Sequence, residues 1–208
     1  MRRLAHGLWL RPALRALSSS AAEVRARRNA GILAAAALLA ACSPKFDWRE
    51  VRSADGGFVV HLPDKPQTVA RTIDFDGGAI EMTMTSTGVG PTMFAVGVAR
   101  LPAQATADSA AVERTVAFFR DALVRNIGGQ VTAARPAPLA ATGGRTLRAA
   151  EAVAARGKVG AGGRAAQLAV RLYVADDRFY QVVALGAEGE LSDDVLETFF
   201  SSFRLLPN

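Results

Sequence analysis

The sequence has very few residues that ligate metals. Its 208 residues include one cysteine, Cys42, and two histidines, His6 and His61. Three or four ligands at a usable spacing cannot be assembled from these, which excludes a zinc site of the usual type. A single cysteine also excludes a disulfide within the chain. The fold must therefore be held together by packing alone, and we expect no metal and no cofactor.

The sequence also lacks a true excess of positive charge outside its first residues. The formal net charge is +6, but seven of the 25 basic residues and one of the 19 acidic residues precede Cys42. Eighteen residues of each sign remain, and the remaining arginines are scattered among acids. A basic stripe of the kind that nucleic-acid-binding proteins carry is missing. We expect no nucleic-acid partner.

No apolar run is long enough to span a membrane. The longest is AGILAAAALLAA, residues 30–41, which rises about 18 Å as a helix, whereas a hydrocarbon core is about 30 Å thick. The basic run RARR, residues 25–28, precedes it, and small residues end it. A basic segment, a short apolar segment and small residues in this order predict a secretory signal.

Cys42 directly follows that signal. Leu39, Ala40, Ala41 and Cys42 resemble the lipobox of bacterial lipoproteins, which is cut before its cysteine. The resemblance implies acyl chains, such as palmitate, on the thiol and new amino group of Cys42. Several chains anchor a protein stably where one is marginal. The alternative is a buried thiol at the end of an alanine-rich helix.

Ser43 resembles the residue that lets lipoproteins move to the outer membrane. The predicted location is therefore the bacterial cell envelope, lipid-anchored and facing the periplasm, with the outer membrane favoured. Residues 1–23 are rich in arginine and nearly free of acids, which describes a mitochondrial transit peptide. A translation start placed too far upstream, with the true start near Val24, is the preferred explanation because it leaves a signal of ordinary length.

The chain divides into three parts on this interpretation. Residues 1–41 are the N-terminal extension and signal, 42–55 are a lipidated tether, and 56–208 form one domain. Phe46 and Trp48 in the tether have two possible places, packed on the domain or resting at the membrane surface.

The first part of the domain alternates apolar and polar residues with a period of two. This period predicts half-buried strands, and turn residues separate them. Four antiparallel strands are expected, at about residues 58–62, 67–75, 80–87 and 94–98.

A helix is expected next, followed by more strands and a second helix. Asp108 or Ser109 caps the first helix, which Gly128 and Gly129 end. Residues 130–153 suit a helix by alanine content and a strand by alternation, and a strand is preferred because their neighbours are strands. Two further strands, 168–174 and 179–185, form a hairpin, and a helix capped by Ser192 closes the domain.

The predicted class is α+β: an antiparallel sheet of about seven to eight strands, in the order four strands, helix, three or four strands, helix, with two amphipathic helices packed on it. The segments GGFVVHLPDKP, IGG, RLYVADDRFYQVVALG and FFSSFRLLP resemble a bacterial family of small exported domains, which in turn resemble the Mog1/PsbP-like α/β fold. The resemblance spans residues 56–207. It implies a fold and transfers no activity.

Residues that suggest chemistry each have a plainer explanation. His61 has no G-x-S-x-G partner motif and is expected at the surface. The run GKVGAGG, residues 157–163, lacks the Lys-Ser or Lys-Thr of a phosphate loop and is expected to be a turn. Asp176 and Asp177 suit a hairpin tip, and Met82 and Met84 are in phase with core residues. No catalytic residue is predicted.

Tyr173 and Tyr180 lie on the paired arms of the predicted hairpin. They are expected to contact each other across the strands, on a face that would be a partner surface if no helix covers it. The predicted function is a non-catalytic binding or assembly accessory that docks on an unknown envelope protein. The alternative is a small-ligand carrier with a pocket between sheet and helix, and a hydrolytic enzyme is third.

Overall fold

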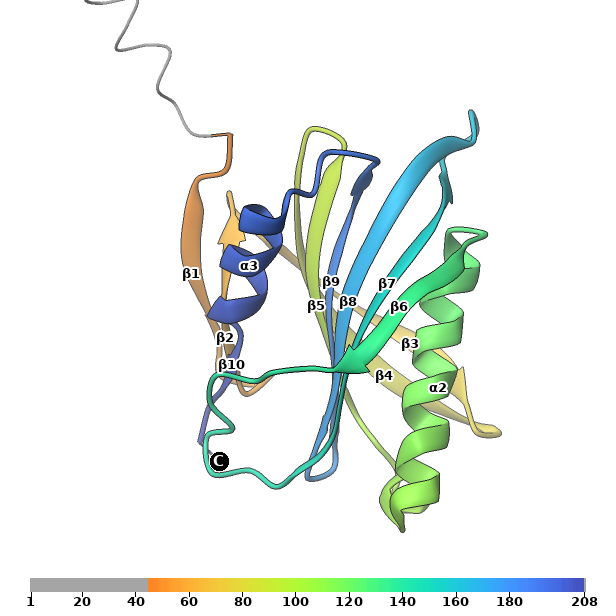
Figure 1. The fold of residues 1–208 in the computed structure, drawn as a ribbon. Coiled ribbons are helices and arrows are strands. Elements are labelled where there is room, and N and C mark those ends of the chain that lie inside the picture. The colour runs from red at the N-terminus through yellow and green to blue at the C-terminus, as the bar shows by residue number, and fades with distance from the viewer. Residues whose placement is uncertain (1–44, 208) are drawn as a thin grey trace, which may run out of the picture. The chain divides into compact units, whose positions relative to one another are not determined.

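The computed structural model describes residues 45–207 (Figure 1). The helices are η1 (Ala103–Thr106), α2 (Ser109–Asn126) and α3 (Asp193–Ser202). The strands are β1 (Trp48–Ser53), β2 (Phe58–Pro63), β3 (Gln67–Phe75), β4 (Gly78–Val89), β5 (Thr92–Arg100), β6 (Gln130–Pro136), β7 (Leu147–Val159), β8 (Arg164–Ala175), β9 (Arg178–Ala187) and β10 (Arg204–Leu205).

The α+β class predicted from the sequence is wrong. Strands hold 53% of the described residues and helices 20%, and the strands form two antiparallel sheets rather than one. The larger has the order β3-β4-β5-β9-β8-β7-β6, and the smaller has the order β1-β2-β10. The second sheet escaped prediction because β1 lies in the predicted tether and β10 has two residues, too few to show a period.

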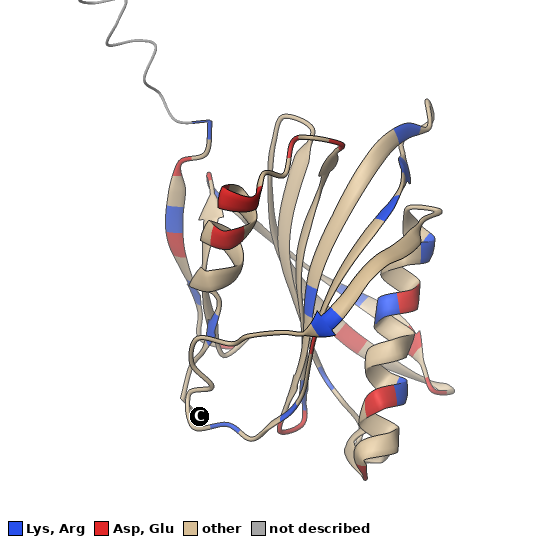
Figure 2. Ribbon diagram, viewed as in Figure 1, with Lys and Arg blue, Asp and Glu red and all other residues tan. Residues whose placement is uncertain are grey.

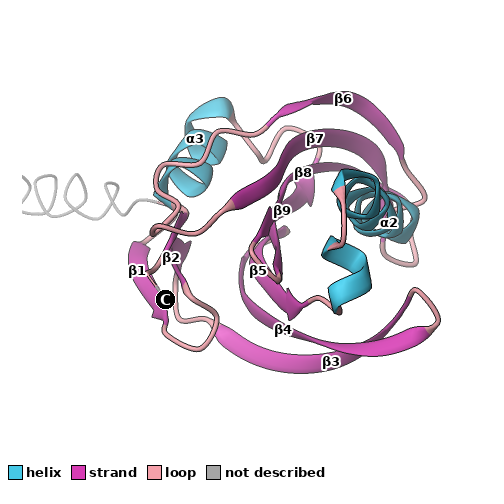
Figure 3. Ribbon diagram, turned by 90° about the horizontal axis from the view of Figure 1, so that it is seen from below, coloured by secondary structure: helices cyan, strands magenta, loops and turns pink. Residues whose placement is uncertain are grey.

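The larger sheet separates two hydrophobic cores, one on each face. Figure 3 shows it curving around α2 and η1, while the small sheet and α3 cover its outer side. Alternation assigns the residues: Ala95 and Ala99 of β5 belong to the inner core, and Phe94, Val96 and Val98 to the outer core. The central strands are therefore buried on both faces.

The predicted ends of the helices are confirmed. The Asp108 carboxylate accepts a hydrogen bond of 2.7 Å from the backbone N–H of Ala111, as the N-cap of α2. Gly128 follows this helix with a φ of +52°, a conformation that glycine adopts without strain. Ser192 caps α3 by accepting from Val195 at 3.4 Å. The preference for strands in residues 130–153 is also confirmed, by β6 and β7.

Phe46 and Trp48 pack on the domain, which resolves the choice that the sequence left open. The ring centroids of Phe46 and Phe94 are 5.6 Å apart, and those of Trp48 and Phe199 are 6.4 Å apart. Lys45 forms an ion pair with Glu190, in the connection between β9 and α3. Residues from 45 onward in the predicted tether thus belong to the folded domain.

Between residues 45 and 207, no helix is long and apolar enough to cross a membrane. The predictions made for Val24, for the lipobox residues Leu39, Ala40 and Ala41, and for Cys42 and Ser43 concern residues outside the described part of the chain.

Candidate functional site

The residues that could have suggested a catalytic, phosphate-binding or metal-binding site lie in the surface, turn and core positions predicted for them. His61 is partly exposed on β2, with its Nε2 atom 4.0 Å from a carboxylate oxygen of Glu50. Residues 160–163 connect β7 to β8 as a turn, and Met82 and Met84 pack in the inner core. Within residues 45–207 no group of three His, Cys, Asp or Glu side chains is placed to hold a metal ion.

Tyr173 and Tyr180 lie directly opposite each other on β8 and β9, as predicted. Both are 0% exposed, because Phe203 packs on them with ring centroids 5.4 and 6.0 Å away. They therefore offer no surface to a partner, and this prediction is corrected. Burial raises the pKa of both hydroxyls.

The two tyrosines differ in hydrogen bonding, which gives a matched pair of variants. The Tyr173 hydroxyl donates to the carbonyl of Pro138 at 2.8 Å, whereas the buried Tyr180 hydroxyl has no partner among the described residues. Tyr173→Phe should therefore cost about 1 kcal/mol of unfolding free energy, and Tyr180→Phe should be neutral or stabilising.

The measurement is urea unfolding at neutral pH and at rising alkaline pH. Burial keeps both hydroxyls protonated in the folded state, whereas the same hydroxyls in the unfolded chain ionise above about pH 10. The free energy of unfolding should therefore keep its full value below that pH and fall as the pH rises above it. Tyr180→Phe should reduce this alkaline loss. A larger cost at neutral pH for Tyr180→Phe than for Tyr173→Phe would contradict the assignment.

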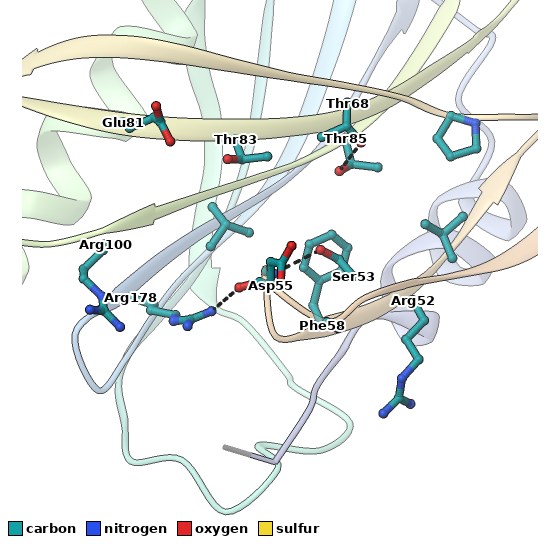
Figure 4. Close-up of a pocket in the computed structure, with 15 residues that line it drawn as sticks. Arg52, Ser53, Asp55, Phe58, Thr68, Glu81, Thr83, Thr85, Arg100 and Arg178 are labelled. Atoms are coloured by element: carbon teal, nitrogen blue, oxygen red, sulfur yellow. Dashed lines mark hydrogen bonds between the residues drawn. The ribbon is translucent and has the colours of Figure 1, made fainter.

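A groove of about 660 Å³ lies on the outer side of the larger sheet, between β3–β4 and the turn that joins β1 to β2 (Figure 4). We call it the threonine groove. It is lined by Val51, Arg52, Ser53, Ala54, Asp55, Gly56, Phe58, Pro66, Thr68, Glu81, Thr83, Thr85, Val98, Arg100 and Arg178.

The floor of the threonine groove is a polar row on an otherwise apolar fold. Thr68 and Thr85 face each other across β3 and β4, with their hydroxyl oxygens 3.1 Å apart. Thr83 lies two residues along the same face of β4, where alternation places it beside Thr85. Phe58 and Val98 add an apolar strip at the wall. Hydroxyls that both donate and accept, next to an apolar strip, suit a ligand with amide groups and small side chains.

Two arginines stand at one end of this groove. Arg100 of β5 and Arg178 of β9 are directly opposite each other, an arrangement in which like charges repel. The Nε atom of Arg100 is 3.1 Å from a carboxylate oxygen of Asp177, but Arg178 donates to the neutral carbonyl of Asp55 at 2.7 Å. Among the described residues no carboxylate lies within ion-pair distance of Arg178. This end can therefore accept an anionic group from outside, although Glu81 stands nearby (Figure 4).

A second groove, of about 590 Å³, lies between α3 and strands β6, β7 and β8. Its floor consists largely of alanine side chains, such as those of Ala152 and Ala154, and α3 adds the acidic residues Asp193, Asp194 and Glu197. Arg171 is held there by a 3.3 Å bond to the carbonyl of Phe200 and by stacking on its ring. This groove has fewer fixed polar donors than the threonine groove.

The sequence analysis missed the residues of the threonine groove. The alternation in β4 placed Thr83 and Thr85 on one face, which is the signal that could have identified the floor. The neighbouring positions of Arg100 and Arg178 depend on the pairing of β5 with β9, strands far apart in the chain. No local sequence pattern predicts the pairing of these two strands.

Comparisons with known proteins assign no family to the chain. No family model matches it, and no curated protein matches it. A solved structure of a Pseudomonas aeruginosa protein of unknown function, described as a candidate regulator, is similar at 13% identity and a TM-score of 0.35. That match covers 69% of this chain and 85% of the other. At this TM-score the likeness carries no argument.

Proposed function

We propose that the protein is a lipid-anchored accessory of the bacterial envelope, whose domain faces the periplasm and binds an envelope protein without catalysis. The lipobox resemblance at residues 39–42 supports the anchor. The main support for the binding role is the threonine groove, because it combines hydroxyl groups, an apolar strip and a pair of adjacent arginines.

The partner we propose is an extended protein segment that carries an acidic side chain. Backbone amides of such a segment can exchange hydrogen bonds with the threonine hydroxyls, and guanidinium groups bind carboxylates in a fixed, often two-pronged geometry. Arg178, which lacks a carboxylate partner within residues 45–207, is the residue expected to receive that side chain.

Packing on the inner face favours this role over a small-ligand carrier. Phe119 stacks on Phe179 with ring centroids 3.9 Å apart, and on Phe75 with centroids 5.6 Å apart. These rings occupy the space between the sheet and α2, so a carrier would have to use the groove of about 590 Å³ between the sheet and α3 instead.

The test is photocrosslinking in living cells of a Gram-negative host. A photoreactive phenylalanine analogue replaces Thr83 in the groove or, as the control, Thr132 on the exposed edge strand β6. We expect a discrete protein adduct from position 83 in the membrane fraction and none from position 132. Combining the label at 83 with Arg178→Ala should weaken that adduct several-fold.

Cys42→Ala serves as the control for the anchor. It should move the protein to the soluble fraction and lower the adduct, because the domain and its partner no longer share a membrane. Equal adducts from positions 83 and 132 would contradict the binding role. Membrane attachment of a Cys42→Ala protein whose intact mass shows that residues 1–41 have been removed would contradict the anchor.

A further inference from the structure

We infer that one end of the domain lies directly on the bilayer, with Lys158 and Arg164 against anionic lipid headgroups. This end, which we call the turn end, consists of the three turns at residues 88–92, 159–164 and 187–191. The inference rests on the proposed anchor at Cys42 and adds to it the surface that meets the membrane.

The chain between the anchor and the folded domain is short. Lys45 is paired with Glu190, and Phe46 packs against Phe94, so the folded domain begins three residues after Cys42. Three residues span at most about 11 Å, however the chain runs. An acylated Cys42 therefore keeps Lys45 close to the lipid surface, and the domain has no length of chain with which to stand away from it.

Lys45 lies at the turn end of the domain. Its partner Glu190 belongs to the connection that leaves β9. Strand pairing sets the other two turns beside that connection, since Met93 is opposite Leu185 and Ala166 is opposite Ala187. Figure 1 shows these turns at the same end of the domain as the start of β1.

Some charged side chains at the turn end are paired and others are not. Glu188 is paired with Arg156 at 3.2 Å and Glu190 with Lys45, so both carboxylates are neutralised. Lys158 and Arg164, at the two sides of the β7–β8 turn, have no ion-pair partner within the described chain, and neither do the exposed carboxylates of Asp193 and Asp194 in the first turn of α3. Figure 2 shows basic positions, in blue, on the two strands that lead into and out of this turn. Basic side chains that have no ion-pair partner attract the protein surface that carries them to anionic lipids.

The turns themselves allow a close approach. The β7–β8 turn between the two cations reads VGAGG, with no charge and no side chain larger than that of Val159. The β4–β5 turn contains Val89, Gly90 and Pro91, and the adjacent Met93 is 39% exposed. The turn end thus presents uncharged tips beside two cations, which is the chemistry of a surface that meets lipid headgroups.

The experiment uses the full chain purified from the membrane fraction, with its intact mass measured first. A mass that begins at Cys42 and includes acyl chains establishes the anchor. The protein is then placed in vesicles of phosphatidylethanolamine and phosphatidylglycerol that contain a quencher lipid. A fluorescent label is attached to Ala161→Cys in the turn end or to Ala107→Cys, another exposed alanine, near the β8–β9 turn at the opposite end.

We expect quenching at position 161 at least several-fold stronger than at position 107. Reversing both tip charges with Lys158→Glu and Arg164→Glu should reduce quenching at 161, whereas reversing Arg71 and Arg114, which are exposed elsewhere, should not.

Equal quenching at the two positions of an acylated protein would overturn the inference and leave the proposed anchor intact. Unchanged quenching after the tip charges are reversed would overturn the headgroup contact. A mass without acyl chains would overturn the proposed anchor, and the inference with it.

Discussion

Replacing Arg145 with alanine should lower the free energy of unfolding by about 3 kcal/mol, at the lower end of the cost of breaking a buried ion pair. The side chain of Arg145 is 4% exposed, and its Nη1 atom is 3.8 Å from a carboxylate oxygen of Asp176. That oxygen has no hydrogen-bond partner within the described residues, so removing the guanidinium leaves the carboxylate with only the backbone N–H of Thr146, which donates to its other oxygen at 3.0 Å. Asp176 is one-third exposed, which limits the cost.

Arg145 also joins segments that are far apart in the chain. Its Nε atom donates to the carbonyl of Leu206 at 3.0 Å, next to the C-terminus. A Cβ atom at Gly57 would stand 2.7 Å from its Nη2 atom, so the β1–β2 turn is packed against the guanidinium. Loss of Arg145 therefore loosens three segments at once.

The measurement is chemical denaturation of Arg145→Ala beside Arg148→Ala. Arg148 is exposed on β7, three residues away, and its removal should change stability by less than about 0.5 kcal/mol. Similar losses for the two variants would show that the buried arginine has no special role.

Replacing Phe119 with alanine should cost about 3–5 kcal/mol, the range for deleting a buried aromatic ring. Phe119 is 3% exposed and lies between Phe75 and Phe179, so its removal opens a cavity in the inner core. The rigid β-strands on one side cannot collapse to fill it.

Phe118→Ala is the matched control on the same helix. Phe118 is partly exposed and contacts Phe75 and Phe119 at the edge of the cluster. Thermal or denaturant unfolding should give a cost for Phe118→Ala that is less than half that of Phe119→Ala. A reversed order would contradict the placement of the inner core.

The elements with strong local signals could be predicted from the sequence. The caps at Asp108 and Ser192, the hairpin around Asp176 and the alternation of residues 168–185 depend on neighbours in the chain. The division of the strands into two sheets could not, because it depends on β1 and β10, which pair with β2 and show little sequence pattern of their own. Whether a face of the sheet is covered likewise depends on tertiary packing. Alternation assigned Tyr173 to the correct face, yet Phe203 covers that face.

The threonine groove shows the same limit. Each arginine at its end is an ordinary residue at the end of a strand, and only the pairing of β5 with β9 makes them neighbours. The wall comes from the β1–β2 turn, which belongs to the other sheet. A site assembled from turns and strand ends in this way has no contiguous motif to find.

The small sheet ties the ends of the domain together, and this has a consequence for biogenesis. Leu205 of β10 pairs with Phe58 of β2, and the N–H of Leu206 donates to the carbonyl of Gly57 at 2.8 Å. Contacts between such distant segments form only after the intervening chain has collapsed. A chain that emerges from its N-terminus therefore keeps this edge of β2 open until Arg204 and Leu205 arrive. Pairing of β10 with β2 is then a late folding step, and a product clipped before Arg204 presents that open edge to proteases.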